Sequence, residues 1–318
     1  MTWTPARRAG ALTAGLLVLV LVVVTAYVVT TDDHPSAGPG PAPTPTATPT
    51  ATATSDPPPG ALDFTLASFN VLGASHTSPR GNEPERPSGR VRAVGAAILL
   101  ARHDADVVGF QELQTGQLRV LQRRTGMDFH PGSSMGPLDS ENSIGWRRDH
   151  WVAVERHTVR IPYFAGGKRA MPFVRLRSRG TGLEAWFANF HNPAETADFH
   201  RQGRFRAAAT RIEIALANRL VATGLPVFVT GDMNERSSYY CRFTSQAPMV
   251  AASGGSTGGT RGRCRPGDPS TIDWIFGSRG VRFSGYAQDR SPLDRVTTDH
   301  PLVTTRVRIT ATRRNPGR

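Results

Sequence analysis

Short apolar stretches recur along the chain after position 60 and predict β-strands. Leu62–Leu66 alternates apolar with polar residues, as a half-buried strand does, and the pattern continues into Ala67–Val71. Further apolar runs predict strands at 106–112, 151–156, 171–177, 183–190, 225–230, 271–276 and 301–309. The domain is therefore predicted to be built largely on β-sheets.

Two segments have the spacing of helices. Ser88 can cap a helix in which Val91, Val94 and Ile98 recur on one face, and an Ala-rich helical pattern runs from about 197 to 221. Many strands, few helices and no internal repeat predict a single α/β domain.

The N-terminal region has the pattern of a membrane anchor. An uncharged, mostly apolar run, Ala11–Val29, is long enough to cross a bilayer as a helix. Arg7 and Arg8 precede the run and acidic residues follow it, which places the rest of the chain outside the cell membrane. We predict an anchor over residues 1–31. A cleaved signal peptide, which would make the protein secreted, is the alternative.

Composition then divides the rest of the chain. Residues 32–60 are nearly all Pro, Thr, Ala and Gly, so they are predicted to form a disordered linker with too few apolar side chains to fold. The catalytic domain is predicted at 61–312, followed by a basic tail at 313–318.

The whole chain carries 38 basic and 25 acidic residues, a formal net charge of +13. Residues 61–318 alone carry +14, so the positive charge belongs to the domain. Such a surface attracts polyanions, with nucleic acid as the expected partner. A solvated basic protein without that partner is the alternative. No protein partner is evident, and a monomer is expected.

Polar side chains suited to catalysis fall at or beside the ends of the predicted strands. They are Asn70, Glu112, His191, Asp232, Asn234, Asp273, Asp299 and His300. Rigid strands can hold such side chains together at one sheet edge. Taken singly, each is equally compatible with a solvated strand end or an ordinary turn. In the turn interpretation, Gly231 permits a tight turn before Asp232 and Asn234.

As a set, these residues supply oxygen ligands, two histidines and an amide, without a nucleophilic serine or thiol arrangement. Oxygen-rich sites with few protein ligands suit Mg²⁺ or Mn²⁺. Histidines near neutral pKa donate to phosphate or exchange protons. The set therefore favours metal-dependent hydrolysis of phosphate esters.

The order of the motifs resembles that of the endonuclease/exonuclease/phosphatase superfamily, which includes deoxyribonuclease-I-like enzymes. The resemblance runs from about Leu62 to Ile309. Its motifs are Ser68–Val71, Val108–Leu113, Asn189–His191, Thr230–Asn234, Ile272–Ile275 and Thr298–Pro301. It implies a four-layered α/β sandwich, in which two packed mixed β-sheets are flanked by helices.

The resemblance also implies roles for individual residues. Glu112 becomes the principal metal ligand, with Asn70 and Asp299 contributing to the metal environment. Asp232 positions or deprotonates the attacking water, and Asn234 holds the phosphate. His300, oriented by Asp273, bonds to a phosphoryl oxygen or acts as a general base. His191 contacts the phosphate and can protonate the leaving oxygen.

The chain departs from some members of the superfamily directly after Asn70. Val71, Leu72 and Gly73 stand where those members carry an acidic residue, which argues against a second metal subsite. The other histidines match no motif and are assigned surface or structural roles: His76, His103, His130, His150, His157 and His200.

Two alternatives to a nuclease remain. One is a sphingomyelinase-like phospholipid phosphodiesterase, which a membrane anchor would place beside lipid. The other is a non-catalytic module that binds polyanions.

The two cysteines, Cys241 and Cys264, flank a Gly-rich segment. In the oxidising environment that the N-terminal segment implies, they are predicted to form a disulfide that restrains this loop.

Overall fold

The computed structural model of the chain describes residues 60–257 and 262–310. The predicted anchor (1–31), all but the last residue of the predicted linker and the basic tail (313–318) lie outside these residues. Within the described ranges, no helix is long and apolar enough to cross a membrane.

The described strands form two six-stranded sheets and one short ladder. Sheet I has the order β13-β14-β1-β2-β4-β3, with bounds Arg282–Gln288, Val303–Thr310, Ala61–Asn70, Val107–Gln111, Ile144–Arg147 and Met127–His130. Sheet II has the order β5-β6-β7-β8-β12-β9, with bounds Trp151–Pro162, Lys168–Ser178, Glu184–His191, Val227–Asp232, Asp273–Ser278 and Met249–Ala251. The ladder pairs β10 (Gly255–Ser256) with β11 (Arg265–Pro266).

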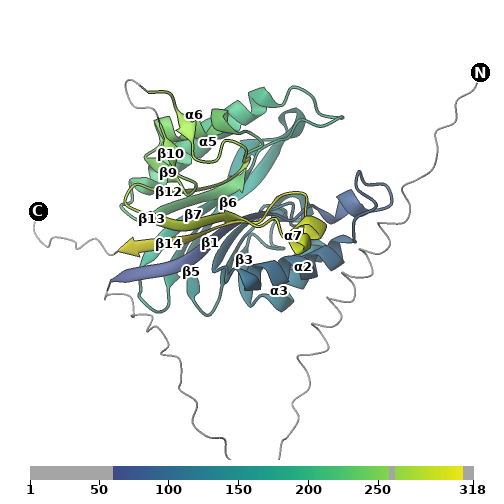
Figure 1. Cartoon of the computed structure of the whole chain (residues 1–318), viewed down its shortest axis with the longest axis horizontal. Helices are drawn as coiled ribbons and strands as arrows, with labels where there is room; N and C mark the ends of the chain where they lie inside the picture. The colour runs from purple at the N-terminus through teal and green to yellow at the C-terminus, as the bar shows by residue number, and fades with distance from the viewer. Residues whose placement is uncertain (1–59, 258–261, 311–318) are drawn as a thin grey trace, which may run out of the picture. The chain divides into compact units, whose positions relative to one another are not determined.

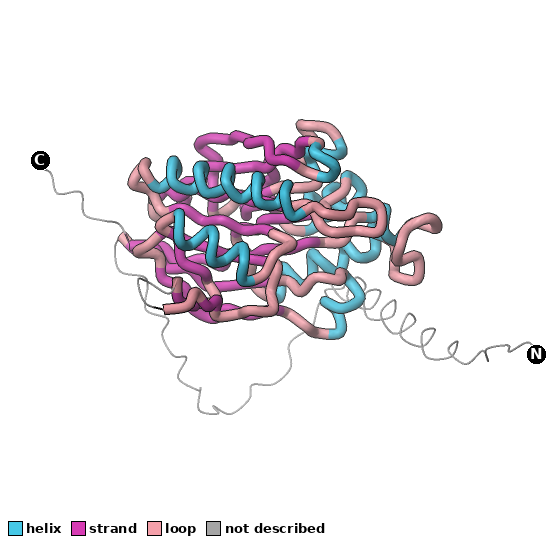
Figure 2. Tube along the Cα trace, turned by 90° about the horizontal axis from the view of Figure 1, so that it is seen from above, coloured by secondary structure: helices cyan, strands magenta, loops and turns pink. Residues whose placement is uncertain are grey.

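Helices cover the outer faces of the two sheets, so the order of layers is helix, sheet, sheet, helix (Figures 1 and 2). The helices are α2 (Gly89–Arg102), α3 (Thr115–Arg124), α4 (Pro137–Ser140), α5 (Gly203–Val221), α6 (Ser237–Gln246) and α7 (Pro292–Thr297), with 3₁₀ turns at Ala74–Thr77 and Phe164–Gly166. Helices α2 and α3 pack on sheet I, and α5 and α6 pack on sheet II. The predicted four-layered sandwich of two mixed sheets is confirmed.

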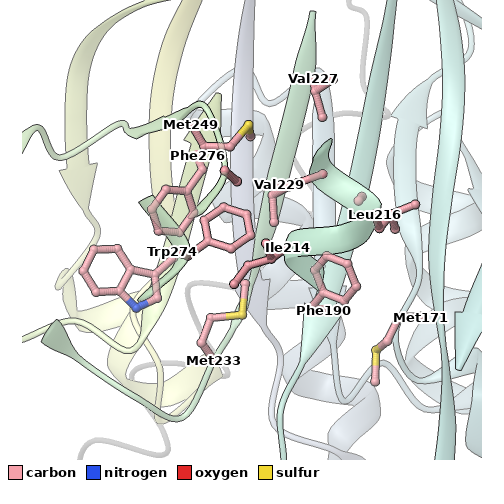
Figure 3. Close-up of a cluster of buried hydrophobic side chains, with 14 of the residues drawn as sticks. Met171, Phe190, Ile214, Leu216, Val227, Val229, Met233, Met249, Trp274 and Phe276 are labelled. Atoms are coloured by element: carbon pink, nitrogen blue, oxygen red, sulfur yellow. The ribbon is translucent and has the colours of Figure 1, made fainter. Parts of the chain in front are cut away.

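Three apolar clusters hold the layers together. The cluster between the sheets centres on Phe64, Phe187 and Phe228, whose rings lie 5.1–5.8 Å apart. The cluster between sheet II and its helices includes Phe190 and Phe276, and Figure 3 shows them in one group with Ile214 and Leu216 of α5. Burial of these apolar side chains fixes which face of each strand points inward, and so fixes where the polar strand ends point.

Each sheet contains one parallel pair, β1 with β2 in sheet I and β7 with β8 in sheet II. In a parallel pair the carboxyl ends of both strands lie at the same edge. Asn70 ends β1, Glu112 follows β2, and His191 and Asp232 end β7 and β8. The two parallel pairs therefore bring four predicted site residues to one edge of the sandwich.

The two sheets approach closely behind that edge. A Cβ at Gly109 would lie 1.9 Å from Thr230 Oγ1 and 2.4 Å from Asn189 Oδ1, so only glycine fits there. Asn189 bridges the gap, since its Nδ2 donates to Phe110 O at 2.7 Å and its Oδ1 accepts from Gln111 Nε2 at 2.6 Å. This buried polar contact holds the site ends of the two sheets together.

The predicted elements are present, with shifted ends and additions. The long helix begins at Gly203, later than the predicted start near 197. Ser88 occupies the N-cap position of α2, but its side chain makes no capping hydrogen bond. The local sequence pattern does not predict α3, α4, α6, α7, β3, β4, β9, β10, β11 or β13.

The predicted disulfide is confirmed. Cys241 on α6 is bonded to Cys264, with a Cα–Cα distance of 5.9 Å. Both cysteines pack against the cluster between sheet II and its helices, so the bond ties the loop to the domain.

A buried carboxyl between α5 and α6 gives the first prediction. Glu213 is 0% exposed, its Oε2 accepts from Tyr239 Oη at 2.8 Å, and burial raises its pKa from 4.5 to about 8. The unfolded chain ionises Glu213 near pH 4.5 while the folded chain keeps the proton up to about pH 8, so this group lowers the free energy of unfolding as pH rises between those values. In the variant Glu213→Gln, the free energy of unfolding should decrease less as pH rises over this range.

Thermal unfolding followed by circular dichroism from pH 4.5 to 8 measures the effect. Glu85→Gln, a change at an exposed carboxylate, is the control and should keep the wild-type profile. If the stability of Glu213→Gln and of the wild type falls with the same slope against pH, Glu213 is not protonated in the folded protein.

Candidate active site

Three predicted site residues form one row at the edge of sheet II. His191 on β7 is paired in register with Asp232 on β8, and Asp232 is paired with Asp273 on β12. Residues in register on neighbouring strands point to the same face of a sheet. The row therefore places an imidazole and two carboxylates side by side.

Asp232 lies at the centre of the site and is 1% exposed. Its Oδ1 accepts from Asn234 N at 2.9 Å, and its Oδ2 accepts from Asn70 Nδ2 at 3.2 Å. His191 Nε2 and His300 Nδ1 each lie 3.7 Å from Oδ2. Burial raises the pKa of Asp232, and the positive charge of His300 opposes that rise. A carboxylate of this kind is a stronger base than an exposed one.

Asp273 and His300 form a direct pair. His300 Nδ1 lies 3.1 Å from Asp273 Oδ1 and 2.9 Å from Oδ2. Asp273 is 3% exposed, so the partner that its burial requires is this imidazole. Burial alone would lower the pKa of His300, but the charges of Asp273 and Asp232 raise it well above its usual value. His300 is therefore held as a cation beside the row.

Glu112 and Asn70 form the other half of the site, at the edge of sheet I. Glu112 adopts a left-handed φ of 59°, a conformation that costs energy for a residue with a side chain. Its Oε1 accepts from Asn70 Nδ2 at 3.1 Å, and its Oε2 accepts from Gly73 N at 2.9 Å. Asn70 thus joins Glu112 to Asp232 across the gap between the two sheets.

His76, which was predicted to have a surface or structural role, lies against Glu112. Its Nε2 is 3.2 Å from Glu112 Oε2, and its Nδ1 is 2.6 Å from Asn82 Oδ1. The hydrogen bond with Glu112 raises the pKa of His76 to about 9. Burial would raise the pKa of Glu112, but His76 and neighbouring groups lower it well below its usual range. No motif or spacing marks His76, because the loop after β1 brings it to Glu112 only in the folded chain.

Buried Arg92 on α2 holds that loop in place. Its guanidinium donates to the carbonyl oxygens of Val71 at 2.7 Å, Gly73 at 3.2 Å and Thr297 at 3.1 Å. The loop after β1 and the end of α7 are thereby fixed to one side chain. This contact explains how residues far apart in sequence reach the same edge.

Tyr163 is a second residue of the site that no sequence motif marks. Its hydroxyl lies 3.3 Å from His191 Nδ1, and Arg169 stacks over its ring at 4.8 Å. Burial raises the pKa of Tyr163 above its usual range, so the hydroxyl stays neutral. Tyr163 therefore orients His191 on the side away from Asp232.

The segment around Asn234 contains a turn directly after β8. Gly231 lies inside β8, and the turn follows at Asp232, whose Oδ1 accepts from Asn234 N at 2.9 Å. A Cβ at Gly231 would lie 2.3 Å from Phe190 O, so close strand approach is the reason for glycine. Asn234 has a left-handed φ of 50° and donates through Nδ2 to Asn192 O at 2.8 Å.

Asp299 is exposed, on the loop between α7 and β14. Thr298 ties this loop to sheet I, because its Oγ1 donates to Asn70 O at 2.7 Å. Among the described residues, Asp299 makes no hydrogen bond or ion pair with Glu112 or Asn70. Asp299 is close enough that its negative charge raises the pKa of both His76 and His300.

Two groups of side chains in the site have the chemistry of a divalent-metal site. Glu112, with Asp299 nearby, offers the hard oxygen donors that Mg²⁺ and Mn²⁺ prefer, while Asn70 presents its Nδ2 to Glu112 and its Oδ1 accepts from Leu72 N. Asp232, Asp273 and His300 also offer ligand atoms that lie within 4.8 Å of one another. In that second group His300 Nδ1 is already bonded to Asp273, and in the first group Glu112 already accepts from Asn70 Nδ2 and Gly73 N.

Comparison with protein families gives one match. The profile described as the Endonuclease/Exonuclease/phosphatase family matches residues 67–300. That range spans all eight predicted site residues. Comparison with curated proteins gives no match.

Solved structures with the same fold cover most of the chain. A mannosyl-6-phosphatase of Bacteroides thetaiotaomicron is 21% identical, with a TM-score of 0.57, and the match covers 77% of this chain and 99% of that one. The human nocturnin catalytic domain with bound sulfate is 17% identical, with a TM-score of 0.59, covering 78% and 95%. TDP2 of D. rerio, complexed with a single-strand DNA product, is 18% identical, with a TM-score of 0.55, covering 78% and 99%.

These structures support the fold, and the profile match covers well over half of the chain. The chain belongs to the endonuclease/exonuclease/phosphatase family.

Proposed function

We propose that this chain is a metal-dependent phosphodiesterase that acts on nucleic acid outside the cytoplasm. The family consists of phosphoesterases that generally depend on a divalent metal. The observation that carries the proposal is the environment of Asp232, which lies 3.7 Å from each of two imidazoles and is joined through Asn70 to Glu112. That arrangement combines a buried base, a fixed cation and a carboxylate that pairs with His76.

The side chains of the site divide the reaction between them. Asp232 accepts a proton from water as the water oxygen attacks phosphorus. His300, held as a cation by Asp273, donates to a phosphoryl oxygen where negative charge develops. His191, oriented by Tyr163, contacts the phosphate. The ester bond then breaks, and the leaving oxygen takes its proton from solvent.

Glu112, with Asn70 and Asp299, would hold the metal ion. When bound, a divalent metal supplies positive charge that stabilises the phosphoryl oxygens. Glu112 is suited to this task because its low pKa keeps it ionised and the Gly73 amide fixes its orientation.

Charge and one exposed aromatic ring favour nucleic acid among phosphodiesters. The formal charge of +14 on residues 61–318 attracts a polyanion. Phe164 and Phe199 stack with ring centroids 4.7 Å apart, and Phe164 contacts Tyr163, the partner of His191. Phe199 is 38% exposed, so its ring offers a face on which a base can stack beside the site.

The location outside the cytoplasm rests on the sequence of residues 1–60. The apolar run Ala11–Val29 and the Pro-rich linker support a domain held away from the outer face of the cell membrane, or secreted if the run is cleaved.

An assay of the purified chain tests the proposal. With Mg²⁺ or Mn²⁺, we expect hydrolysis of an oligothymidylate and of bis(4-nitrophenyl) phosphate, and weaker activity on 4-nitrophenyl phosphate and on sphingomyelin vesicles. EDTA should abolish activity, and added metal should restore it. Faster hydrolysis of sphingomyelin than of oligonucleotide would favour the lipid substrate. Retention of oligonucleotide without cleavage would identify a binding module.

A further inference from the structure

A pocket with three arginines adjoins the catalytic cluster. It has a volume of about 330 Å³, and it includes Asp299 and His300 of the site. Arg86, Arg290 and Arg295 also line it, together with Asp294. Arg295 belongs to α7, which packs beside α2 (Figure 1). A ligand in this pocket would therefore lie next to a phosphate bound at His300.

Two of these arginines carry charge that no carboxylate neutralises. Among the described residues, neither Arg290 nor Arg295 lies within ion-pair distance of an acidic side chain, and both are exposed. Arg290 donates to the amide oxygen of Gln288, which holds the guanidinium without cancelling its charge. Exposed guanidinium groups in this state are suited to an anion.

The acidic side chains nearest in sequence are engaged elsewhere. Asp289 is 2.7 Å from His103 Nε2, and its Oδ1 accepts from Ser291 N at 2.7 Å. Asp294 is 3% exposed, and its Oδ1 accepts from Leu302 N at 3.0 Å. Asp294 is part of the pocket lining and its charge interacts with that of Arg290, but its buried carboxyl is bonded to the backbone and forms no direct ion pair with either arginine.

Arg86 is fixed in a different way. Its Nε donates to Glu83, and its Nη1 donates to Arg295 O at 2.7 Å and to Thr298 O at 3.1 Å. Arg86 therefore contributes little net charge but fixes the backbone on which Arg295 and Asp299 stand. The pocket is a preorganised surface and not a chance meeting of long side chains.

We infer that this pocket binds a second phosphate of the substrate, the one adjacent to the cleaved phosphate in a nucleic-acid chain. The inference rests on the proposed function and narrows its substrate to a polymer with successive phosphates. The volume matches a ligand of nucleotide size. A phosphomonoester or a sphingomyelin headgroup has a single phosphate and would leave Arg290 and Arg295 unused.

The test compares two phosphodiesters that differ in having a neighbouring phosphate. An oligothymidylate has flanking phosphates, and bis(4-nitrophenyl) phosphate has none. For the double variant Arg290→Gln/Arg295→Gln, we expect KM for the oligonucleotide to rise about tenfold and the slope of log(kcat/KM) against log[salt] to become shallower by about 1. The kinetic constants for the small diester should change by less than about a factor of two.

A control variant separates this pocket from the general charge of the domain. Arg123→Gln/Arg124→Gln removes the same charge from exposed positions in the last turn of α3. A rise in KM as large as in the pocket variant would show general attraction and overturn the inference. So would an unchanged KM for the oligonucleotide in the pocket variant. If the wild-type chain cleaves neither diester, the proposed function fails, and the inference fails with it.

Discussion

Asp232→Asn is expected to reduce kcat for phosphodiester hydrolysis by about 10³-fold, because the amide cannot accept the proton of the attacking water. The side chain keeps its size, and Asn234 N can still donate to the remaining oxygen at Oδ1. Folding should therefore survive, although the contact with Asn70 Nδ2 is lost. Steady-state kinetics with bis(4-nitrophenyl) phosphate at saturating metal measure the effect.

Asp128→Asn is the matched control for this variant. Asp128 is exposed on β3, so its amide should leave kcat unchanged. Thermal unfolding of both variants separates loss of catalysis from loss of fold. If the folded variant Asp232→Asn keeps the wild-type kcat, Asp232 is not the base that accepts the proton of the attacking water.

Glu112→Gln is expected to weaken Mn²⁺ binding by more than about 100-fold, because loss of an outer-shell partner alone weakens binding by about 10- to 100-fold. Isothermal titration with Mn²⁺ in the absence of substrate measures this directly and does not depend on turnover. The amide nitrogen would also face Gly73 N or Asn70 Nδ2, both of which donate to the carboxylate in the wild type.

A second variant decides between the two groups of possible ligands. Asp273→Asn should keep Mn²⁺ affinity if the metal lies at Glu112, since Asp273 then serves to orient His300. The reverse result, with affinity lost in Asp273→Asn and kept in Glu112→Gln, would place the metal on Asp232, Asp273 and His300.

Much of the fold and several site positions could be predicted from local patterns. The cores of β1, β2, β7 and β8 are short apolar runs, and a polar residue after such a run is visible without any structure. Asn70, Glu112, His191 and Asp232 were found in this way. The elements that were missed carry weaker local signals: α6, Ser237–Gln246, is rich in Ser, Tyr and Thr, and β13 is an edge strand that is largely exposed.

Relations between distant residues could not be predicted in the same way. His76 meets Glu112, and Tyr163 meets His191, through loops whose course depends on tertiary contacts. The basic pocket beside His300 likewise depends on the bonds of Asp289 with His103 and of Asp294 with the backbone of Leu302. Neither the apolar pattern nor the charge count contains that information.

The sequence by itself determined the strands, the order of the motifs and the residue types available for phosphoester chemistry. These follow from short-range periodicity and from the identity of each side chain. Only the tertiary structure decided which polar groups converge, because the register of two parallel strand pairs and the packing of two sheets set the distances among Asn70, Glu112 and Asp232. Contacts over such long sequence separations depend on the burial of the whole core, and no local segment specifies them.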